Sequence, residues 1–461
     1  STLVMAKQIS QETFDGVVQE NIQDFEMSPE EAIADAVTQF ESQGVNLANI
    51  VKDLALRQGD SASKHPAIEA VENLQAALAL DPVNENAIKS NLEKLKSECD
   101  IDLAHRCLAG KNNAYEVLFK LLEKFQSSPE MVGSILSAWI ALFNGQPDLL
   151  DAAGRALLLK VLQEQSNNVP NATATIKVIR LSCVMHESNR QAFVEEKLIP
   201  ALMSALEEHK DSAEVVRETC HALRTLTFDD DPRVPFGKAH EHAKMIVQEA
   251  DALRKILAVS KDYIDNTAVL GELFLTLSKL AVRNEFCQEI MDLGGLGLML
   301  GALEKNMDHQ GIVSQALIVL KAIAGNDEVK VAVVKSNGVE LILSCMEKHI
   351  RQSGVCETGC AALTTLSLRN PDHCDCIIRN NGPEIILKAM QIHANKPSVQ
   401  KQACMLIRNC VARTRQYCEE FLKLGAESLI HDAMTRHSDI CKDEAKGALR
   451  DLDCKVELQT P

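Results

Sequence analysis

The chain is poor in aromatic residues. Phe, Trp and Tyr make up 3% of its 461 residues, with a single Trp and three Tyr. Sheet proteins favour aromatic and β-branched side chains, so this composition argues against a β-sandwich and favours packing between Ala-, Leu- and Ile-rich helices. Apolar residues still reach 46%, which is enough to fill a continuous core. We therefore predict an all-α protein.

An excess of positive charge is also missing. The chain has 48 Lys and Arg against 65 Asp and Glu, a net charge of −17 and a pI of about 5.3. Nucleic-acid-binding proteins usually carry a basic surface that neutralises phosphates, so we expect no nucleic-acid partner. The acidity is uneven, because residues 1–60 hold eleven Asp and Glu but three Lys and Arg.

The sequence contains none of the common signatures of catalysis. It has no Gly-x-x-x-x-Gly-Lys phosphate loop, no Gly-x-Ser-x-Gly and no His-Glu-x-x-His, and no apolar run near the length of a membrane span. Its fifteen cysteines are scattered and include no Cys-x-x-Cys, a pattern typical of reduced core thiols. We expect a non-enzymatic monomer without cofactor, metal or membrane contact, in the cytoplasm with access to the nucleus.

One pattern recurs about every forty-four residues. An apolar helix ends, a break follows, and a step of small residues opens the next apolar helix. A fixed period of this size indicates a repeat array rather than a single globular core. The equivalent step positions are Ala114, Gly154, Leu198, Glu249, Gly295, Gly338, Gly382 and Ala426.

Breaks in this pattern predict four parts. Residues 1–56 form an acidic N-terminal helical segment, with one helix near 10–25 and a second that Ser28 caps. Residues 57–66 are a polar linker and residues 67–98 are two capping helices. About eight three-helix repeats fill residues 99–456, with a proline-containing insertion loop at 228–248.

The third helix of each repeat carries an apolar-x-x-apolar tetrad, as in Leu320-Lys-Ala-Ile323. The outer two residues share a helix face and should enter the core. The middle two should then point away, onto the surface that stacking makes concave. Basic residues occupy many of these middle positions: Arg180, Arg224, Lys279, Lys321, Arg408 and Arg450.

Two strings resemble the helices of armadillo repeats: Lys197–Leu206 resembles a second helix and Ala403–Cys410 a third helix. Longer strings, among them Gln11-Glu-Thr-Phe14, Gly145–Asp151 and Phe228-Asp-Asp-Asp231, resemble the armadillo repeat-containing protein six family. The resemblance covers nearly the whole chain. It implies a right-handed superhelical solenoid, an intracellular location and no catalytic site.

Armadillo proteins that bind nuclear-localisation signals hold the peptide with Trp and Asn on successive third helices. Here Asn409 alone matches the Asn ladder, and Trp139 is the single Trp. We therefore do not expect an import receptor.

The basic middle positions predict a scaffold or adaptor that binds an acidic or extended peptide in its concave groove, with Arg180, Arg224, Lys279, Lys321, Arg408, Asn409 and Arg450 as the site. A solvated surface neutralised by neighbouring carboxylates explains the same residues without a ligand. The alternative function is an assembly factor or chaperone-like adaptor that clamps a partner by shape through loop and convex surfaces. In the first case, the acidic segment before residue 57 could cover the groove and compete with outside ligands.

His240-Glu-His242 resembles the His-x-His substrate motif of protein-histidine methyltransferases, although Glu241 is larger than the usual small middle residue. His240 and His242 are thus candidate modification sites, and such a methyltransferase is a candidate partner. With Asp229, Asp230 and Asp231 the two histidines could supply metal ligands, but a polar loop explains them as well. His373-Cys-Asp-Cys376 lacks the usual zinc spacing and is expected to be a set of core thiols.

Overall fold

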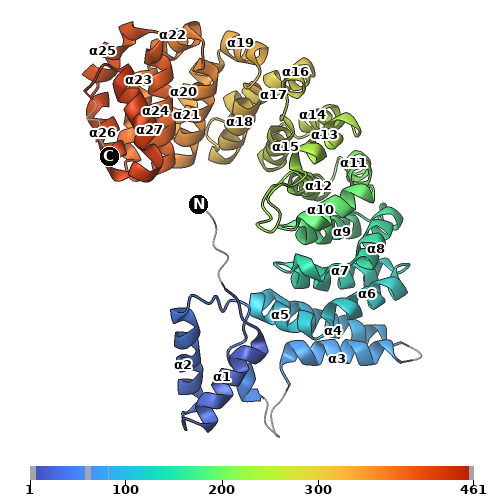
Figure 1. Cartoon of the computed structure of the whole chain (residues 1–461). Helices are drawn as coiled ribbons and strands as arrows, with labels where there is room; N and C mark the ends of the chain where they lie inside the picture. The colour runs from blue at the N-terminus through green and yellow to red at the C-terminus, as the bar shows by residue number, and fades with distance from the viewer. Residues whose placement is uncertain (1–6, 58–63, 81–82, 456–461) are drawn as a thin grey trace. The chain divides into compact units, whose positions relative to one another are not determined.

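The structure is a computed structural model, and it describes residues 7–57, 64–80 and 83–455. These residues contain 27 α-helices and three short 3-10 helices (Figure 1). An isolated bridge between Lys7 and Val45 is the one β-type contact among them. The prediction of an all-α fold is confirmed.

The chain divides into two compact units, residues 1–242 and residues 243–461. The division falls inside helix α13 (Ala239–Gln248). The 23 described α-helices after α4, together with the 3-10 helix η2 as the first member of the second set, form eight successive sets of three, as the sequence period predicts.

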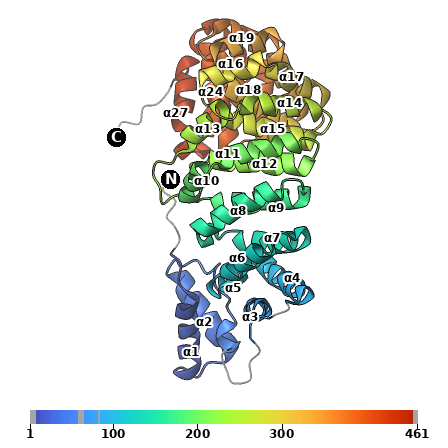
Figure 2. The same cartoon turned by 90° about the vertical axis from the view of Figure 1, so that its right-hand side faces the viewer.

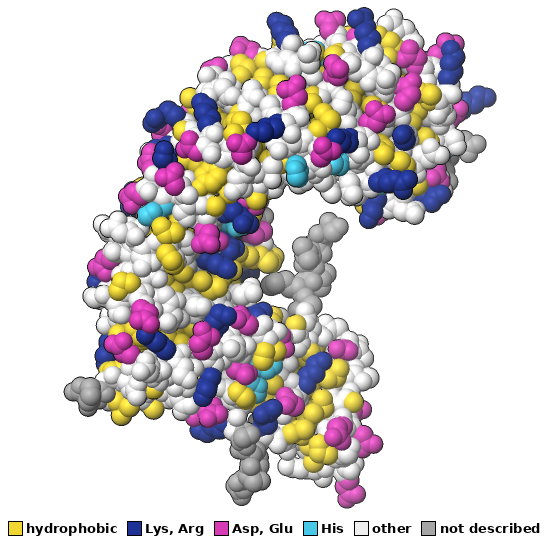
Figure 3. All heavy atoms as spheres, turned by 180° about the vertical axis from the view of Figure 1, so that it is seen from behind, with side chains coloured by type: hydrophobic (Ala, Val, Ile, Leu, Met, Phe, Trp, Pro, Cys, Tyr) yellow, Lys and Arg dark blue, Asp and Glu magenta, His cyan; other side chains and the backbone are white. Residues whose placement is uncertain are grey.

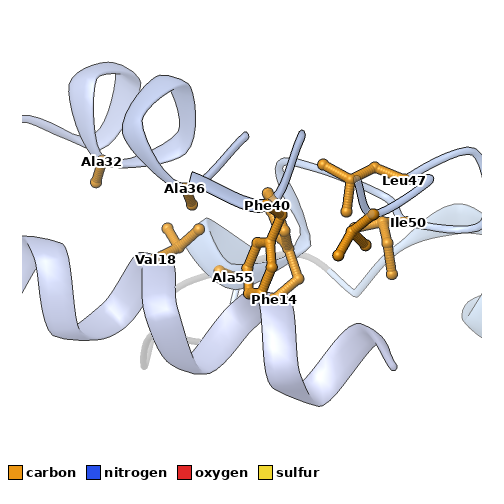
Figure 4. Close-up of a cluster of buried hydrophobic side chains, with 9 residues drawn as sticks. Phe14, Val18, Ala32, Ala36, Phe40, Leu47, Ile50 and Ala55 are labelled. Carbon is orange, nitrogen blue, oxygen red and sulfur yellow. The ribbon is translucent and has the colours of Figure 1, made fainter. Parts of the chain in front are cut away.

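The N-terminal helices α1 (Gln11–Gln23) and α2 (Pro29–Ser42) form a small core of their own. Val18 of α1 points toward Ala32 and Ala36 of α2, and the Phe14 ring lies beside that of Phe40, 6.0 Å between centroids (Figure 4). Phe40, Leu47, Ile50 and Ala55 complete this core, so the turn of 3-10 helix η1 (Leu54–Arg57) packs into it.

The start of α2 has the predicted capping box. The Ser28 side chain accepts a hydrogen bond from the Glu31 amide, and the Glu31 carboxylate accepts one from the Ser28 amide. The expected C-terminal end of α1 was wrong, because the helix stops at Gln23 and Phe25 is 64% exposed. Glu26 has a φ of 52°, and this left-handed turn directs the chain into α2.

The N-terminal segment docks on α5 (Leu103–Lys111). Val51 packs against Ala104 and Leu108, and Lys111 lies 3.3 Å from the Glu12 carboxylate. The contacts described for this segment join it to α5, and the cover over the basic positions stays a prediction.

The remaining helices of unit 1 lie in layers one above the other (Figure 2). Each third helix packs against the next, from α4 to α7, α9 and α12. The predicted capping helices are α3 and α4. Because α4 packs on α7 in the same way as α7 packs on α9, these two helices extend the stack of repeats. The bounds are α3 (Pro66–Leu78), α4 (Glu85–Ile101), α6 (Ala114–Phe125), α7 (Pro129–Phe143), η2 (Pro147–Leu149), α8 (Ala152–Glu164), α9 (Val169–Cys183), α10 (Glu187–Glu195), α11 (Leu198–Glu208) and α12 (Ala213–Leu226).

Unit 2 repeats the same arrangement, with α15, α18, α21, α24 and α27 packed in succession. The bounds are α14 (Ala252–Asp262), α15 (Thr267–Leu280), α16 (Asn284–Asp292), α17 (Gly295–Lys305), α18 (Gln310–Ile323), α19 (Asp327–Lys335), α20 (Gly338–Lys348), α21 (Ser353–Ser367), α22 (Pro371–Arg379), α23 (Gly382–Ile392), α24 (Pro397–Ala412), η3 (Arg415–Tyr417), α25 (Cys418–Lys423), α26 (Ala426–Arg436) and α27 (Ser438–Asp451).

The small-residue step has a steric cause. Asn337 and Asn381 adopt left-handed conformations, with φ of 56° and 58°, and turn the chain from the first helix into the second. The glycine that follows each of them meets the first helix closely. A Cβ at Gly338 would lie 2.7 Å from the Val333 carbonyl oxygen, and one at Gly382 would lie 2.5 Å from that of Ile377. At these two steps a Cβ would therefore collide with the first helix, whereas the steps at Ala114, Leu198 and Ala426 accommodate one.

A polar link joins successive repeats at the end of the second helix. Four histidines each place Nε2 2.5–2.8 Å from a carbonyl oxygen of the preceding repeat. Because a carbonyl only accepts, Nε2 carries the proton in each case. Gln165 makes an equivalent bond of 3.0 Å to the Gln126 carbonyl. We call the four the histidine rungs: His209 with Ser166, His349 with Met307, His393 with Ile350 and His437 with Ala394.

The predicted insertion loop is shorter than expected. Residues 239–248 belong to α13, so the irregular connection ends at Lys238. Pro232, Pro235 and Gly237 interrupt helix only before this point, and nothing in the sequence prevents a helix after it. We call residues 227–238 the connecting loop.

None of the described helices is by itself long and apolar enough to cross a membrane. The helices α16 and α17, bent by 69° at their junction, meet the criteria of length and composition only when taken as a pair.

We expect His393→Ala to lower the free energy of unfolding by about 1–2 kcal/mol, because it deletes a bond between repeats at a side chain that is 8% exposed. His393→Gln should recover part of this loss, since Gln165 spans the same gap in unit 1. Urea denaturation followed by circular dichroism measures both. The exposed His309, which is not a rung, gives the control His309→Ala, and equal stability of the two alanine variants would contradict the role of the rungs.

Candidate binding surface on the third helices

The tetrads of the third helices are oriented as predicted. Leu320 and Ile323, the outer pair on α18, are at most 1% exposed, whereas Lys321 between them is exposed. The outer pairs of α12, α15, α21, α24 and α27 are equally buried. The middle residues are partly or fully exposed, with Thr225 as a buried exception. The third helices therefore present their middle residues as one surface in each unit.

In unit 1 the charge of Arg180 on this surface is neutralised. The Arg180 Nε bonds the Glu218 carboxylate of α12, and the two side chains are only 19% and 12% exposed. Arg224 is half-buried. On the face drawn in Figure 3, basic and acidic side chains are interspersed rather than separated. For Arg180 the arrangement is that of a neutralised polar surface.

In unit 2, Arg408 of α24 and Arg450 of α27 share one carboxylate. Asp451 lies 3.3 Å from Arg408 Nε and 2.9 Å from Arg450 Nε. The hydrogen bond to Asp451 raises the pKa of Arg450. The two arginine side chains are 47% and 65% exposed, so one negative charge is shared by two accessible positive charges.

Two further arginines, which the sequence analysis missed, lie beside this pair. Arg369 follows α21 and Arg413 follows α24, and both are exposed. With Arg408 they line a hollow of about 520 Å³ between α21 and α24, whose single acidic lining residue is Asp451. Within the described residues, neither Arg369 nor Arg413 forms an ion pair. We call this hollow the arginine hollow.

Arg369 has a φ of 60°, a left-handed conformation uncommon for a residue with a side chain. It stands outside the tetrad, so helical spacing gave no signal for it. The same is true of Arg413, which caps the end of α24.

Asn409 has a structural role that speaks against the predicted peptide contact. Its Nδ2 donates to the Thr364 carbonyl at 3.0 Å and lies 3.4 Å from Ser367 Oγ. These bonds tie α24 to α21 and occupy the amide donor that an import receptor would use to clamp a peptide.

Lys279 and Lys321, on α15 and α18, are exposed. They do not line the arginine hollow. The predicted residues of unit 2 thus fall into two sets: Arg408 and Arg450 meet at one place, and the two lysines lie apart from it.

The acidic residues of the connecting loop hold the loop itself. The Asp231 carboxylate accepts from the Glu187 amide at 2.9 Å and from Arg233, while Asp230 lies 2.6 Å from Arg190. Arg190 is fully buried, and Glu187, its second partner, is 1% exposed. These carboxylates are therefore occupied by arginines and a helix N-terminus rather than arranged as metal ligands.

The electrostatics of this network are set by its hydrogen bonds. The bond and charge of Arg233 hold the pKa of Asp231 far below its usual range. Burial alone would raise the pKa of Glu187, but hydrogen bonds from Gln191, the Lys238 amide and Arg190 lower it. Both carboxylates are ionised in the folded protein at neutral pH.

The two candidate modification sites differ. His240 is exposed, but His242 is 3% exposed and its Nδ1 lies 2.9 Å from the Leu226 carbonyl oxygen. Burial lowers the pKa of His242. A modifying enzyme could reach His242 only if this contact opened, whereas His240 is accessible as the chain stands.

In the cluster around His373, His373 and Cys374 are buried core groups and Cys376 is half-buried. His373 is 5% exposed and its Nδ1 lies 2.9 Å from the Leu366 carbonyl oxygen. Cys374 Sγ lies 3.4 Å from the Asn409 carbonyl oxygen, and Cys376 Sγ lies 3.6 Å from Asn380 Nδ2.

Stacked three-helix sets, with a left-handed residue before every second helix except α8, define an armadillo-repeat protein, a fold commonly used for binding other proteins. The armadillo repeat-containing protein 6 N-terminal domain model matches residues 6–67, and the ARMC6 model matches residues 67–460. The chain belongs to the armadillo repeat-containing protein 6 family.

Relatives agree with this assignment. Armadillo repeat-containing protein 6 of Homo sapiens is 44% identical over 303 residues, which is 65% of this chain and 60% of the relative. The homologue of Drosophila melanogaster is 38% identical over 308 residues, 66% of this chain and 65% of the relative. The matched region thus spans less than two thirds of the length of either relative.

Solved structures support the fold. An engineered protein aligns with a TM-score of 0.68 at 17% identity, covering 96% of this chain and 99% of that protein. β-Catenin, from a structure that concerns a phosphorylation switch in its interaction with cadherin, aligns with a TM-score of 0.60 at 16% identity, covering 96% of this chain and 81% of that one.

We expect acid to weaken the connecting loop through Asp231. A carboxyl whose folded-state pKa is depressed contributes stability above its unfolded pKa of about 4 and loses it as the pH falls toward the folded value. Thermal unfolding between about pH 6 and 3 should therefore show a shallower pH dependence for Asp231→Asn than for the wild type. At neutral pH the variant should be less stable by about 1–3 kcal/mol, because Arg233 loses a charged partner. A matched change at the exposed Asp211 should leave the slope unchanged; equal slopes for Asp231→Asn and the wild type would contradict the assignment.

Proposed function

We propose that this chain is a non-catalytic scaffold that binds an acidic, extended segment of a partner protein in the arginine hollow of unit 2. The observation that carries the proposal is the convergence of Arg369, Arg408 and Arg413 on one hollow that contains a single carboxylate. In a chain with net charge −17, this local excess of positive charge is unusual.

Arginine suits such a ligand. Its planar guanidinium presents several N–H groups and binds a carboxylate or phosphate through two parallel hydrogen bonds. The hydroxyl groups of Thr364 and Thr365 on α21 line the same hollow, and both bond their own helix, to Cys360 and Ala361. The lining is thus positive and polar.

Asp451 acts as an internal competitor. Its contact with Arg408 is 3.3 Å long, and the arginine side chain is nearly half exposed. Exposed ion pairs of this kind contribute roughly 0–1 kcal/mol. A partner carboxylate can therefore displace Asp451 from Arg408 at little cost and engage Arg413 at the same time.

The fold supports a protein partner. β-Catenin, which has the same fold, interacts with cadherin under the control of phosphorylation. All fifteen cysteines of the present chain are free thiols, which supports the proposed cytoplasmic location.

Charge reversal tests the proposal. We expect Arg408→Glu with Arg413→Glu to weaken binding of an extended Asp- and Glu-rich peptide by about tenfold or more, since each charge-assisted contact contributes roughly 1.5–3 kcal/mol. Asp451→Asn should tighten binding, because it removes the competitor. Fluorescence anisotropy of the labelled peptide at low salt and at about 0.3 M salt measures both effects.

Two controls separate charge recognition from general damage. Arg379→Glu changes an exposed arginine on α22 outside the hollow and should leave the affinity within about twofold. A peptide with Asn and Gln in place of Asp and Glu should bind weakly to every variant. The proposal is wrong if the wild type does not distinguish the two peptides, or if Arg379→Glu and the double reversal weaken binding equally.

A second candidate function is an adaptor that clamps a partner by shape. The observation in its favour is Phe236, which is 91% exposed in the connecting loop that Asp231 and Arg190 hold in place. An aromatic side chain presented on a fixed loop is a common binding anchor. Loss of partner binding in Phe236→Ala, with no effect of the arginine reversals, would favour this function over the first.

A further inference from the structure

Three helix ends in unit 1 bring two histidines and a glutamate together. His65 caps the N-terminus of α3, Glu98 lies in the last turn of α4, and His105 lies in the first turn of α5. One nitrogen or carboxylate oxygen from each of these side chains lies within 4.8 Å of the other two. The two imidazole rings are 5.0 Å apart between centroids.

Neighbouring groups orient the His105 ring. The Asp102 carboxylate lies 2.7 Å from His105 Nδ1, and the same oxygen accepts from the His105 amide at 2.9 Å. Asp102 is itself fixed as the cap of α5. When Nδ1 donates its proton to Asp102, Nε2 of the neutral ring is left as the possible ligand atom, and the Glu98 carboxylate lies 4.0 Å from it. A carboxylate that holds the far nitrogen of a histidine is the usual outer shell of a metal-bound imidazole.

The site is open to a small ion on one side. His65 is 3% exposed, whereas the Glu98 and His105 side chains are 20% and 18% exposed. His65 Nδ1 accepts a hydrogen bond of 3.2 Å from the Ala67 amide. If Nε2 of His65 binds the ion, the ring proton must lie on Nδ1, which can then no longer accept from the Ala67 amide. Zinc binding would therefore replace this 3.2 Å hydrogen bond with a metal–nitrogen bond.

We propose that His65, Glu98 and His105 bind one zinc ion. Two imidazole nitrogens and one carboxylate oxygen suit Zn²⁺, which takes four ligands and fills the remaining position with water. Ligand atoms at about 2.0–2.1 Å from a tetrahedral zinc are roughly 3.3 Å apart. The pair now 4.0 Å apart therefore needs to close by less than about 1 Å.

A bound zinc ion would link the start of α3 to α4 and α5, next to the place where the N-terminal segment packs on α5. Residue 65 ends the link from the N-terminal segment, and α5 receives that segment through Val51 and Glu12. Zinc would add a second attachment, from the link itself to α4 and α5. This role is independent of the arginine hollow in unit 2.

The full chain, reduced and freed of metal with a chelator, is titrated with zinc chloride by isothermal calorimetry. We expect one site with a dissociation constant of about 1 μM or tighter. X-ray absorption of the 1:1 sample should show only nitrogen and oxygen at about 2.0–2.1 Å, with the outer scattering of imidazole. Zinc should also raise the melting temperature.

His105→Ala and Glu98→Gln should each weaken this binding at least about tenfold, in line with the loss of a ligand. His186→Ala is the matched control, because His186 also caps a helix and lies 3.0 Å from a carboxylate, that of Asp148, outside the cluster. Circular dichroism confirms that each variant is folded, and Glu98→Gln keeps the side-chain size where loss of His105 disturbs α5.

Three results would overturn the proposal. The first is no binding at about 100 μM zinc, which is far weaker than protein zinc sites. The second is a sulfur shell at about 2.3 Å, which would assign the ion to some of the fifteen thiols. The third is equal affinity in the wild type and in folded Glu98→Gln and His105→Ala.

Discussion

The packing of each third helix on the next is the interaction on which the other features depend. The outer pairs of the tetrads are buried in the core beside this contact, and four histidine rungs link successive repeats at the ends of the second helices. Because the outer residues of a tetrad face the core, the two middle residues lie on the face of the helix that points away from it. The binding surface is therefore a by-product of how the core is filled.

Charge on that surface is decided by what the next repeat supplies. Arg180 meets Glu218 from the following third helix, and the pair is largely buried. Arg408 meets Asp451 in the same way, but Asp451 also serves Arg450, and the two nearby turns add Arg369 and Arg413. The same tetrad position is thus neutral in one repeat and positive in another.

The sequence predicted well what depends on period and on local chemistry. The tetrads, the eight sets of three helices and the capping box at Ser28 follow from spacing and from short-range hydrogen bonds. The sequence did not predict contacts between residues that are distant in the chain. Asn409 is drawn into a bond with Thr364, forty-five positions earlier, and His65 meets His105 only because α3 and α5 begin side by side. Arg369 and Arg413 were missed because they lie in turns, where helical spacing carries no information.

The close contacts at Gly338 and Gly382 have a consequence for mutations, because the protein is built as a linear array of repeats. Each repeat touches only its neighbours, so a displacement has no route around the site where it arises. A methyl group added at Gly338 would lie 2.5 Å from Val333 Cγ1 and would wedge α19 away from α20. This displacement would shift the neighbouring repeats of the stack as well. Tolerance to mutation should therefore vary along the chain with the period of the repeats.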